Sequence, residues 1–389
     1  MSASDKIVLG VLGLGLASLA FLLSAGLCGL ARVVSPKLGL IDSPGGHKGH
    51  KKPTPLGGGV AIWLTTIAVI GLGFLVADVD GGLLPTAVLK HLGGLHDRSR
   101  ELAGILALAT VVMVMGLIDD RFALGWRIRL GVQVGLALLL VLSGVRVTLF
   151  WPFSHPIVGG LITILWVVGL TNAFNMLDNM DGLSAGVGLV ASSLFAGAQL
   201  AVGSLFAPGV LLVLVGALAG FLVHNRYPAR LFMGDAGSNF LGFLLGSLTV
   251  AGTYYRYEAD YSPYSVLTPL LVMAVPLYDA MSVIVIRLRE GRSPFLGDRR
   301  HFSHRLVDRG LTPPQAVRTI DLVTLASGLG ALLLHRLDAL GACVVMGQTL
   351  CLLGVVAILE VSSPRPERVH AEAKHIADLP SKAGVGSEG

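Results

Sequence analysis

Residues 171–186 read TNAFNMLDNMDGLSAG and interrupt a chain that is otherwise largely apolar. Asn172, Asn175, Asp178 and Asp181 recur every three residues, so on a helix they share one slowly drifting face. A charged side chain near the middle of a membrane-spanning helix costs about 2.5–3.5 kcal/mol, so such residues are functional candidates. Two carboxylates and two amides on one face predict a site for a cation and a polar substrate. The alternative is a polar loop between two membrane helices that merely faces water.

The composition predicts an all-α, polytopic membrane protein. Of 389 residues, 53% are hydrophobic and 14% are charged, whereas soluble domains carry about 25% charged residues. The 51 glycines fit helices that pack closely within a membrane. The net charge is +5, but no basic cluster is interleaved with aromatic residues. Nucleic-acid binding is therefore not expected, and the membrane lipid is the expected surrounding partner.

Eleven apolar segments approach the bilayer-spanning length of about 20 residues. They are 7–34, 58–77, 102–118, 130–149, 157–176, 183–203, 208–224, 238–255, 264–287, 319–335 and 339–360. Residues 1–361 are therefore expected to form one integral-membrane domain. The tail 362–389, rich in polar residues and Pro, is expected to be disordered.

Eleven spans place the two termini on opposite sides of the membrane, and the charges orient them. Lys and Arg number 21 on one side and 7 on the other. The richer side carries the C-terminal tail and the loops 35–57, 119–129, 172–182, 224–237 and 288–318. The positive-inside rule makes this side cytoplasmic and leaves the N-terminus outside. Every unusual polar cluster falls in these loops, which predicts an active site at the cytoplasmic face.

Two of these loops carry acids that suit a metal ion. Adjacent Asp119 and Asp120 repel one another unless a cation or a titration relieves them. Asp235 opens a span, where the free N–H groups of a helix attract phosphate. Carboxylate oxygens suit Mg²⁺, which leaves coordination sites for phosphate oxygens. The alternatives are a solvated acidic helix end and a helix cap formed by Asp235 or Ser238.

Basic side chains gather in two further loops. Loop 35–57 carries Lys48 and His50, beside lysines that also fit a purely orienting role. Loop 288–318 forms a basic cup suited to a pyrophosphate, made of Arg292, Arg299, Arg300, His301, His304 and Arg305. Zinc binding is not favoured, because neither Cys nor a third His lies close by. Together the loops predict Mg²⁺-dependent transfer of a phosphate-bearing group from a soluble nucleotide to a lipid.

Four motifs carry a family resemblance: GLIDDR at 116–121, NAFNMLDNMDGL at 172–183, FMGDAGS at 232–238 and DRRHFSHRL at 298–306. In this order they resemble the polyprenyl-phosphate N-acetylhexosamine-1-phosphate transferases over residues 7–360. Those are multi-pass enzymes of the bacterial plasma membrane. They move a sugar-1-phosphate from a UDP-sugar to undecaprenyl phosphate, release UMP, and need Mg²⁺ or Mn²⁺.

Within this family the last motif separates two branches. Residues 293–306 resemble the SPF…D…H-x-H-H-R-L pattern of the branch that uses UDP-GlcNAc. The alternative within the family is the phospho-N-acetylmuramoyl-pentapeptide transferase, whose pattern is a His-His-His run after Pro. A secondary transporter is the alternative from another class, but transporters place such acids near the bilayer midplane. The oligomeric state stays open, a homodimer included.

The resemblance implies roles for the acidic residues. Asp235 is the principal Mg²⁺ ligand in this interpretation. Asp119, with Asp120 beside it, serves as base or orienter for the lipid phosphate and as a further metal contact. Asp178 helps to hold the nucleotide, and Asp181 supports the site.

The resemblance also implies binding roles and exposes departures. Asn175 holds the nucleotide beside Asp178, and Phe232 stacks on uracil. His301 and His304 contact the diphosphate, and Lys48 and His50 match basic positions of the first loop. The departures are Ser303 in place of His, His47 in place of Arg, Arg127 in place of Lys, and Ala123 in place of a third Asp. A mechanism that needs the third carboxylate therefore does not apply to this chain. If position 303 is a contact, replacing Ser303 with His is expected to leave the rate unchanged or raise it, whereas a large loss would mean that the site is built around the hydroxyl.

Overall fold

The computed structural model describes residues 2–43, 53–78, 88–89, 93–94, 97–148, 155–255, 261–294 and 300–362. Its described part is helical apart from two short antiparallel strands, β1 (Ile41–Asp42) and β2 (Thr54–Pro55). The long helices are α1 (Ala3–Lys37), α2 (Gly58–Asp78), α4 (Ser99–Phe122), α5 (Trp126–Leu142), α6 (Pro156–Leu177), α7 (Leu183–Ala201), α8 (Phe206–Asn225), α9 (Gly234–Ala251), α11 (Ala274–Arg289), α13 (Pro313–Leu329) and α14 (Ala339–Ser362). Shorter pieces are η2 (Pro263–Leu267), α10 (Thr268–Val272), α12 (Phe302–Val307) and η3 (Gly330–Arg336). The all-α prediction is confirmed.

The structure confirms a polytopic membrane protein, although the count of eleven spans stays a prediction. Among the described residues, eight helices are long and apolar enough to cross a membrane. A ninth span results if η2–α10 and α11, which meet at 57°, count as one bent segment. Every predicted segment overlaps a helix, but α5 has only 17 residues. Helix α9 is the other long helix outside these spans, because it begins with the polar sequence GDAGSN.

The backbone turns sharply at the ends of the helices that carry the acids. Helix α4 ends directly after Asp119–Asp120 because Ala123 adopts a left-handed conformation (φ 49°), and its N–H donates to the Asp119 carbonyl. Helix α7 begins after Gly182 (φ 81°), in a conformation that favours glycine. These stops leave the acidic residues at helix ends rather than in mid-membrane.

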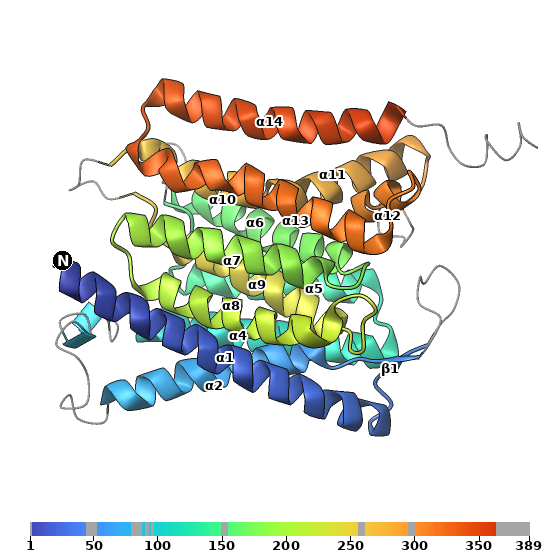
Figure 1. Cartoon of the computed structure of the whole chain (residues 1–389), viewed down its shortest axis with the longest axis horizontal. Coiled ribbons are helices and arrows are strands. Elements are labelled where there is room, and N and C mark those ends of the chain that lie inside the picture. The colour runs from blue at the N-terminus through green and yellow to red at the C-terminus, as the bar shows by residue number, and fades with distance from the viewer. Residues whose placement is uncertain are drawn as a thin grey trace, which may run out of the picture.

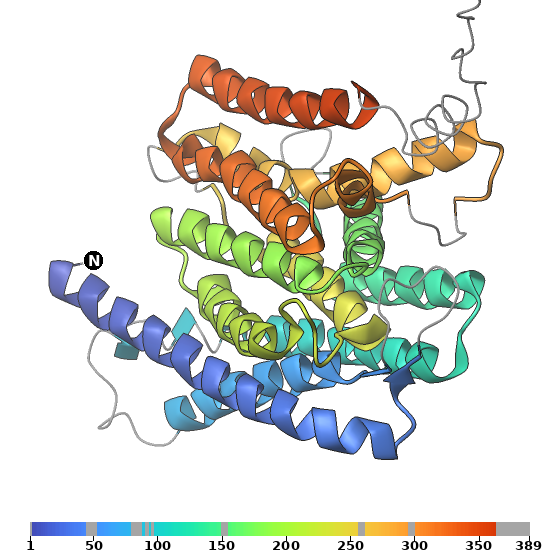
Figure 2. The same cartoon turned by 45° about the vertical axis from the view of Figure 1, so that its right-hand side comes forward.

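Helix α9 lies at the centre of the bundle and packs against α2, α4, α6 and α7 (Figure 2). Close backbone approach requires glycine at its contacts. A Cβ at Gly116 of α4 would lie 2.3 Å from the Asp235 carbonyl oxygen, and one at Gly59 of α2 would lie 2.2 Å from the Gly237 nitrogen. Small residues allow this approach where lipid supplies no hydrophobic drive between helices. The N-terminus of α9 is thereby fixed against α2 and α4.

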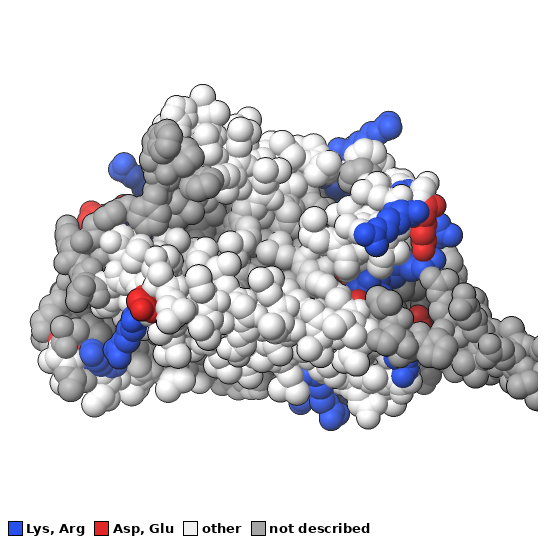
Figure 3. All heavy atoms as spheres, turned by 90° about the horizontal axis from the view of Figure 1, so that it is seen from above, with Lys and Arg blue, Asp and Glu red and all other residues white. Residues whose placement is uncertain are grey.

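The predicted site loops share one end of the bundle. Figure 1 shows β1, α12 and the C-terminal ends of α1 and α14 at the same end, opposite the N-terminus. On the face drawn in Figure 3, Lys, Arg, Asp and Glu gather toward the two ends and leave a band of other residues between them. This distribution fits helices that cross an apolar layer. Which end faces the cytoplasm stays a prediction.

Candidate active site

Three of the predicted acids meet where α4, α5 and α9 converge. Asp119 Oδ2 accepts a hydrogen bond from Arg129 Nη1 at 2.7 Å. The same nitrogen lies 3.3 Å from Asp235 Oδ2. The Asp119 side chain is almost fully buried, whereas 34% of the Asp235 side-chain surface is exposed. The structure therefore brings two predicted loops together and adds a cation between them.

Asp120 lies on the N-terminus of α9. Its Oδ1 accepts from the Asp235 N–H at 2.8 Å, and its Oδ2 accepts from the Ala236 N–H at 3.1 Å. A carboxylate at this end of a helix satisfies free N–H groups and interacts favourably with the helix dipole. Gly234 (φ 72°) leaves the room, because a Cβ there would lie 2.6 Å from Asp120 Oδ2. Both oxygens of Asp120 thus fix the backbone of Asp235, and its role as a metal ligand stays a prediction.

The two asparagines of α6 have different partners. Asn175 Nδ2 donates to Asp235 Oδ1 at 2.8 Å and to Ser238 Oγ at 3.1 Å. Asn172 Nδ2 instead donates to Gln133 Oε1 at 2.6 Å, and Gln133 passes the network on to Asn239 of α9. Asn175 therefore reaches the site, while Asn172 belongs to a buried network that fixes α5, α6 and α9 relative to one another.

The predicted helical face ends at Leu177, so the acids that follow lie in the turn before α7. Burial raises the pKa of Asp178 to about 7, and the nearby carboxylates of Asp120 and Asp181 add to this effect. The Asp178 carboxylate accepts no side-chain or backbone hydrogen bond from the described part of the chain. Asp181 Oδ2 accepts from the Ala229 N–H at 2.8 Å and so secures the loop before α9.

That loop, residues 226–233, is held from two sides. Asn225 accepts from the Gly182 N–H and donates to the Leu231 carbonyl, both at 2.9 Å. Phe232 N–H donates to the Pro55 carbonyl at 2.9 Å, and its own carbonyl accepts from Gly58 at 3.0 Å. The half-buried Phe232 is therefore fixed beside Asp235 by β2 and α2. Its stacking role stays a prediction.

Both histidines of the basic cup lie at α12: His301 is the residue that caps its N-terminus, and His304 lies within it. His301 is buried, and its Nδ1 lies 3.0 Å from Asp279 Oδ2 on α11. Asp279 Oδ1 also accepts from the Phe302 N–H at 2.6 Å. The rings of His301 and His304 have centroids 6.5 Å apart. The Asp279 carboxylate thus fixes both the imidazole of His301 and the start of α12.

Three arginines of the basic cup are paired with acids: Arg305, Arg300 and Arg292, whose Nε lies 3.7 Å from Glu290 Oε2. Arg305 Nη2 donates to Ser282 Oγ at 2.7 Å and lies 3.2 Å from Glu360 Oε1 of α14. Arg300 Nη1 lies 2.9 Å from Glu290 Oε1. Their predicted diphosphate contacts stay predictions. Arg299, Lys48 and His50 lie outside the described residues, so the predicted role of Arg299 in the basic cup and the substrate-binding roles of Lys48 and His50 also stay predictions.

Several residues of this arrangement were missed from sequence. Arg129 lies in the predicted loop 119–129, together with Asp119 and Asp120. A basic residue in the same loop as two acids was the feature of the sequence that could have identified it. Asp279 is a lone acid within a predicted span, which is itself a functional signal. Gln133 is a similar polar interruption. Nothing in the sequence pairs Asp279 with His301, because the two are 22 residues apart and meet only through packing.

The acidic cluster has donor chemistry that fits a divalent cation. Asp119 Oδ2 and Asp235 Oδ2 converge on one guanidinium nitrogen, so the space between them attracts positive charge. Among the described residues, no group of three or more His, Cys, Asp or Glu is spaced to hold a metal ion. Mg²⁺ commonly uses one or two carboxylates, with water and phosphate oxygens completing its shell. Asp119 and Asp235 supply two carboxylates of this kind.

Comparisons with known proteins agree with this geometry. Residues 102–253 match the glycosyl transferase family 4 model. The chain is 30% identical over 369 residues to decaprenyl-phosphate N-acetylglucosaminephosphotransferase of Mycolicibacterium smegmatis, covering 87% of this chain and 86% of that protein. It is 29% identical over 316 residues to the probable undecaprenyl-phosphate N-acetylglucosaminyl 1-phosphate transferase of Bacillus subtilis, covering 78% and 80%.

A third relative is similar over a comparable length. The undecaprenyl-phosphate alpha-N-acetylglucosaminyl 1-phosphate transferase of Escherichia coli K12 is 30% identical over 312 residues, 77% of each chain. The matches cover most of the chain, and the family model includes Asp119, Asp120, Asp178 and Asp235. The chain therefore belongs to glycosyl transferase family 4 and is a membrane-embedded sugar-1-phosphate transferase of the polyprenyl-phosphate GlcNAc-1-phosphate transferase family.

Proposed function

We propose that this protein transfers N-acetylglucosamine-1-phosphate from UDP-N-acetylglucosamine to undecaprenyl phosphate and releases UMP. The observation that carries the proposal is the convergence of Asp119, Asp235 and Arg129 where α4 ends and α5 and α9 begin. The names of the relatives support the sugar and the polyprenyl acceptor. The reaction would place a lipid-linked sugar diphosphate at the start of cell-envelope polysaccharide synthesis.

In the proposed reaction, an oxygen of the lipid phosphate attacks the phosphorus that carries the sugar. A new P–O bond forms, and the bond between that phosphorus and the bridging oxygen of UMP breaks. Asp119 orients the lipid phosphate or accepts its proton. The Arg129 guanidinium offsets the negative charge of the transferred group, because phosphoryl transfer depends mainly on positioning and charge neutralisation.

Asp235 and Asp119 would hold Mg²⁺, with Mn²⁺ as a substitute of similar oxygen preference. When bound, the ion neutralises diphosphate charge and orients the reacting oxygens. Asp120 acts through Asp235 by fixing the first amides of α9. Asn175 orients the Asp235 carboxylate through its hydrogen bond to Oδ1.

The donor would lie between the turn before α7 and the loop before α9. Phe232 offers an aromatic face for uracil, and Asp178 offers an acceptor without a described partner. His301 would meet the diphosphate in the orientation that Asp279 gives it. Ser303, also on α12, donates its hydroxyl hydrogen to Asn179 Oδ1 at 2.5 Å, so α12 is tied directly to the nucleotide-binding turn.

The polyprenyl chain would lie in an apolar groove between α10–α11 and α14. This groove has a volume of about 310 Å³ and is lined by Leu270, Leu271, Leu277, Met281, Leu350 and Leu353 among others. Tyr278 also lines it, and the next residue, Asp279, holds His301. An isoprenoid seated here would therefore end beside the diphosphate-binding residues. The site would face the cytoplasm of a bacterial plasma membrane, as the charge bias predicts.

The decisive experiment is transfer of labelled sugar phosphate from UDP-GlcNAc to undecaprenyl phosphate by the purified protein in detergent with Mg²⁺. Asp235→Asn is expected to abolish transfer, while the exposed Asp308→Asn is the matched control and keeps it. Both variants should retain the thermal midpoint of the parent. Full activity of Asp235→Asn would refute the role of the cluster. Use of UDP-MurNAc-pentapeptide in preference to UDP-GlcNAc would refute the proposed donor.

A further inference from the structure

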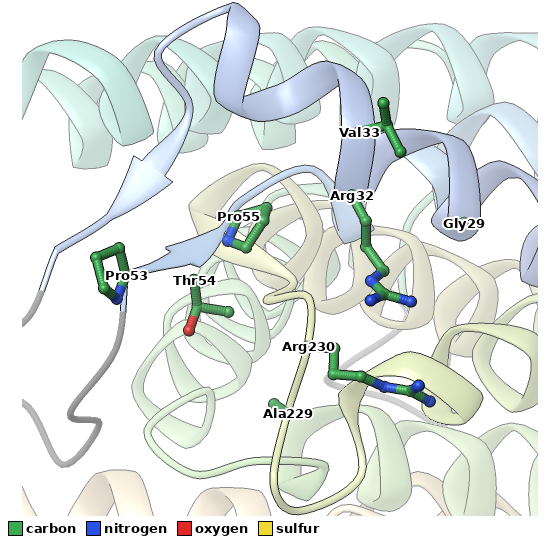
Figure 4. Close-up of a pocket in the computed structure, with 8 residues that line it drawn as sticks. All are labelled: Gly29, Arg32, Val33, Pro53, Thr54, Pro55, Ala229 and Arg230. Atoms are coloured by element: carbon green, nitrogen blue, oxygen red, sulfur yellow. The ribbon is translucent and has the colours of Figure 1, made fainter.

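A second cavity lies beside β2 (Figure 4). It has a volume of about 460 Å³ and is bounded by the last turns of α1, by β2 and by the loop before α9. Figure 4 shows Arg32 of α1 and Arg230 of the loop directed into the same space. Gly29, one turn before Arg32, adds no side chain to the wall. None of the proposed catalytic residues lines this cavity.

The charge of the cavity is uniformly positive. Arg32 and Arg230 are its only charged lining residues among those that the structure describes. Arg32 is half-buried, and its guanidinium makes no hydrogen bond or ion pair within the described ranges. Arg230 Nη2 donates to the Val223 carbonyl at 3.1 Å, which leaves most of its guanidinium N–H groups available. Two guanidinium groups without an acid between them form a site for an anion, and their planar N–H groups match phosphate.

The position of Arg32 along α1 relates the cavity to the membrane surface. Helix α1 has 35 residues, a length of about 52 Å at ~1.5 Å per residue, which exceeds the ~40–45 Å of a whole bilayer. Arg32 lies about 8 Å before the end of the helix at the same rise per residue. This distance is comparable with the thickness of a lipid headgroup layer. The neighbouring Leu30 and Val33 are exposed apolar residues, 58% and 59%. The cavity therefore opens beside a lipid-facing surface.

A single arginine near the end of a span also fits membrane orientation alone. Two features distinguish this one from a surface anchor. Arg32 lines a surface pocket bounded by β2 and the loop before α9, and the exposed Arg230, from a distant part of the chain, lines the same pocket. The loop that carries Arg230 is fixed, because Arg230 N–H donates to the His224 carbonyl at 2.8 Å and His224 Nε2 contacts the Ala25 carbonyl of α1 at 3.0 Å.

We propose that this cavity is a phosphate-binding site, separate from the catalytic site, that takes the headgroup phosphate of an anionic membrane lipid. Its wall is continuous with the nucleotide side of the protein. Phe232, two residues after Arg230, donates its N–H to Pro55 of the cavity wall at 2.9 Å. A bound lipid phosphate would thereby hold β2 and the loop before α9 in place.

The test measures lipid binding to the full chain and needs no nucleotide sugar, so its outcome is independent of the proposed reaction. Protein in detergent is titrated with phosphatidylglycerol or phosphatidylcholine, and bound lipid is counted by native mass spectrometry. We expect one phosphatidylglycerol to bind at least tenfold more tightly than phosphatidylcholine. Arg32→Gln and Arg230→Gln should each weaken it about tenfold, in line with the loss of one charge-assisted contact. Arg226→Gln, an exposed arginine of the same loop outside the cavity, is the control and should bind like the parent.

Thermal midpoints and size-exclusion profiles establish that the variants fold. Equal affinity for the two lipids in the parent protein would overturn the proposal, as would an Arg226→Gln loss as large as that of Arg32→Gln. A second experiment adds inorganic phosphate to the protein with phosphatidylglycerol bound and measures whether the lipid is displaced. If millimolar phosphate leaves the lipid bound, the lipid source is supported. If it displaces the lipid at equal affinity, the phosphate site stands and its lipid source is refuted.

Discussion

Replacement of Ser303 by His tests how α12 is joined to the turn before α7. Ser303 is buried, and its hydroxyl donates to Asn179 Oδ1, which places Asn179 to donate to the Met176 carbonyl. The family pattern alone led to the expectation that His is tolerated or beneficial here. The buried, hydrogen-bonded Ser303 instead favours the other outcome, a site built around the hydroxyl.

The magnitude follows from two costs. Adding a ring to a filled site costs about 1–3 kcal/mol. Leaving the buried Asn179 oxygen without its donor costs a further ~1–3 kcal/mol. If α12 shifts to relieve even half of this cost, His301 leaves its position, and kcat/KM falls by about 10–100-fold at ~1.4 kcal/mol per factor of ten. Ser303→Ala, which only removes the bond, should lose about tenfold or less.

The assay is steady-state transfer from UDP-GlcNAc, with thermal midpoints measured in parallel. A double-mutant cycle with Asn179→Ala should give a coupling energy of about 1 kcal/mol, since the two side chains form one bond. Ser192→Ala is the control, because Ser192 is equally buried but donates only within α7, to Gly188. Parent-like kcat/KM in Ser303→His, or additive effects of Ser303→Ala and Asn179→Ala, would refute the reasoning.

Three further changes separate roles within the site. Asp120→Asn should lower the free energy of unfolding by about 1 kcal/mol, because a charged cap of α9 is lost; a denaturation midpoint equal to that of Asp235→Asn would contradict this. Asp279→Asn should lower kcat at least tenfold, and adding His301→Ala should cost little more, because the two residues act as a unit; fully additive losses in the transfer assay would speak against the pair. Ala274→Trp should raise KM for undecaprenyl phosphate while KM for UDP-GlcNAc changes by less than about twofold, since it fills the apolar groove; an equal effect on a short-chain acceptor would exclude the groove as the chain site.

Much of the helical architecture was predictable because membrane spans are local features of sequence. A run of about 20 apolar residues satisfies its backbone only as a helix in lipid. Each of the eleven predicted segments overlaps a helix, and the turns at Ala123 and Gly182 fall where the polar motifs interrupt the apolar runs. The count of spans was less certain from sequence, because α9 is central and polar at its start.

The sequence by itself determined the helical membrane class, the order of the polar motifs and the residue types that phosphate transfer needs. Only the tertiary structure decided their partners. Asp120 proved to lie on the α9 amides, Arg129 between Asp119 and Asp235, and Asp279 on His301. The physical reason is that hydropathy and turn propensity act over a few neighbouring residues. Hydrogen-bond partners in a bundle depend on which helices pack together. Here glycines allow α2 and α4 to pack closely against the start of α9.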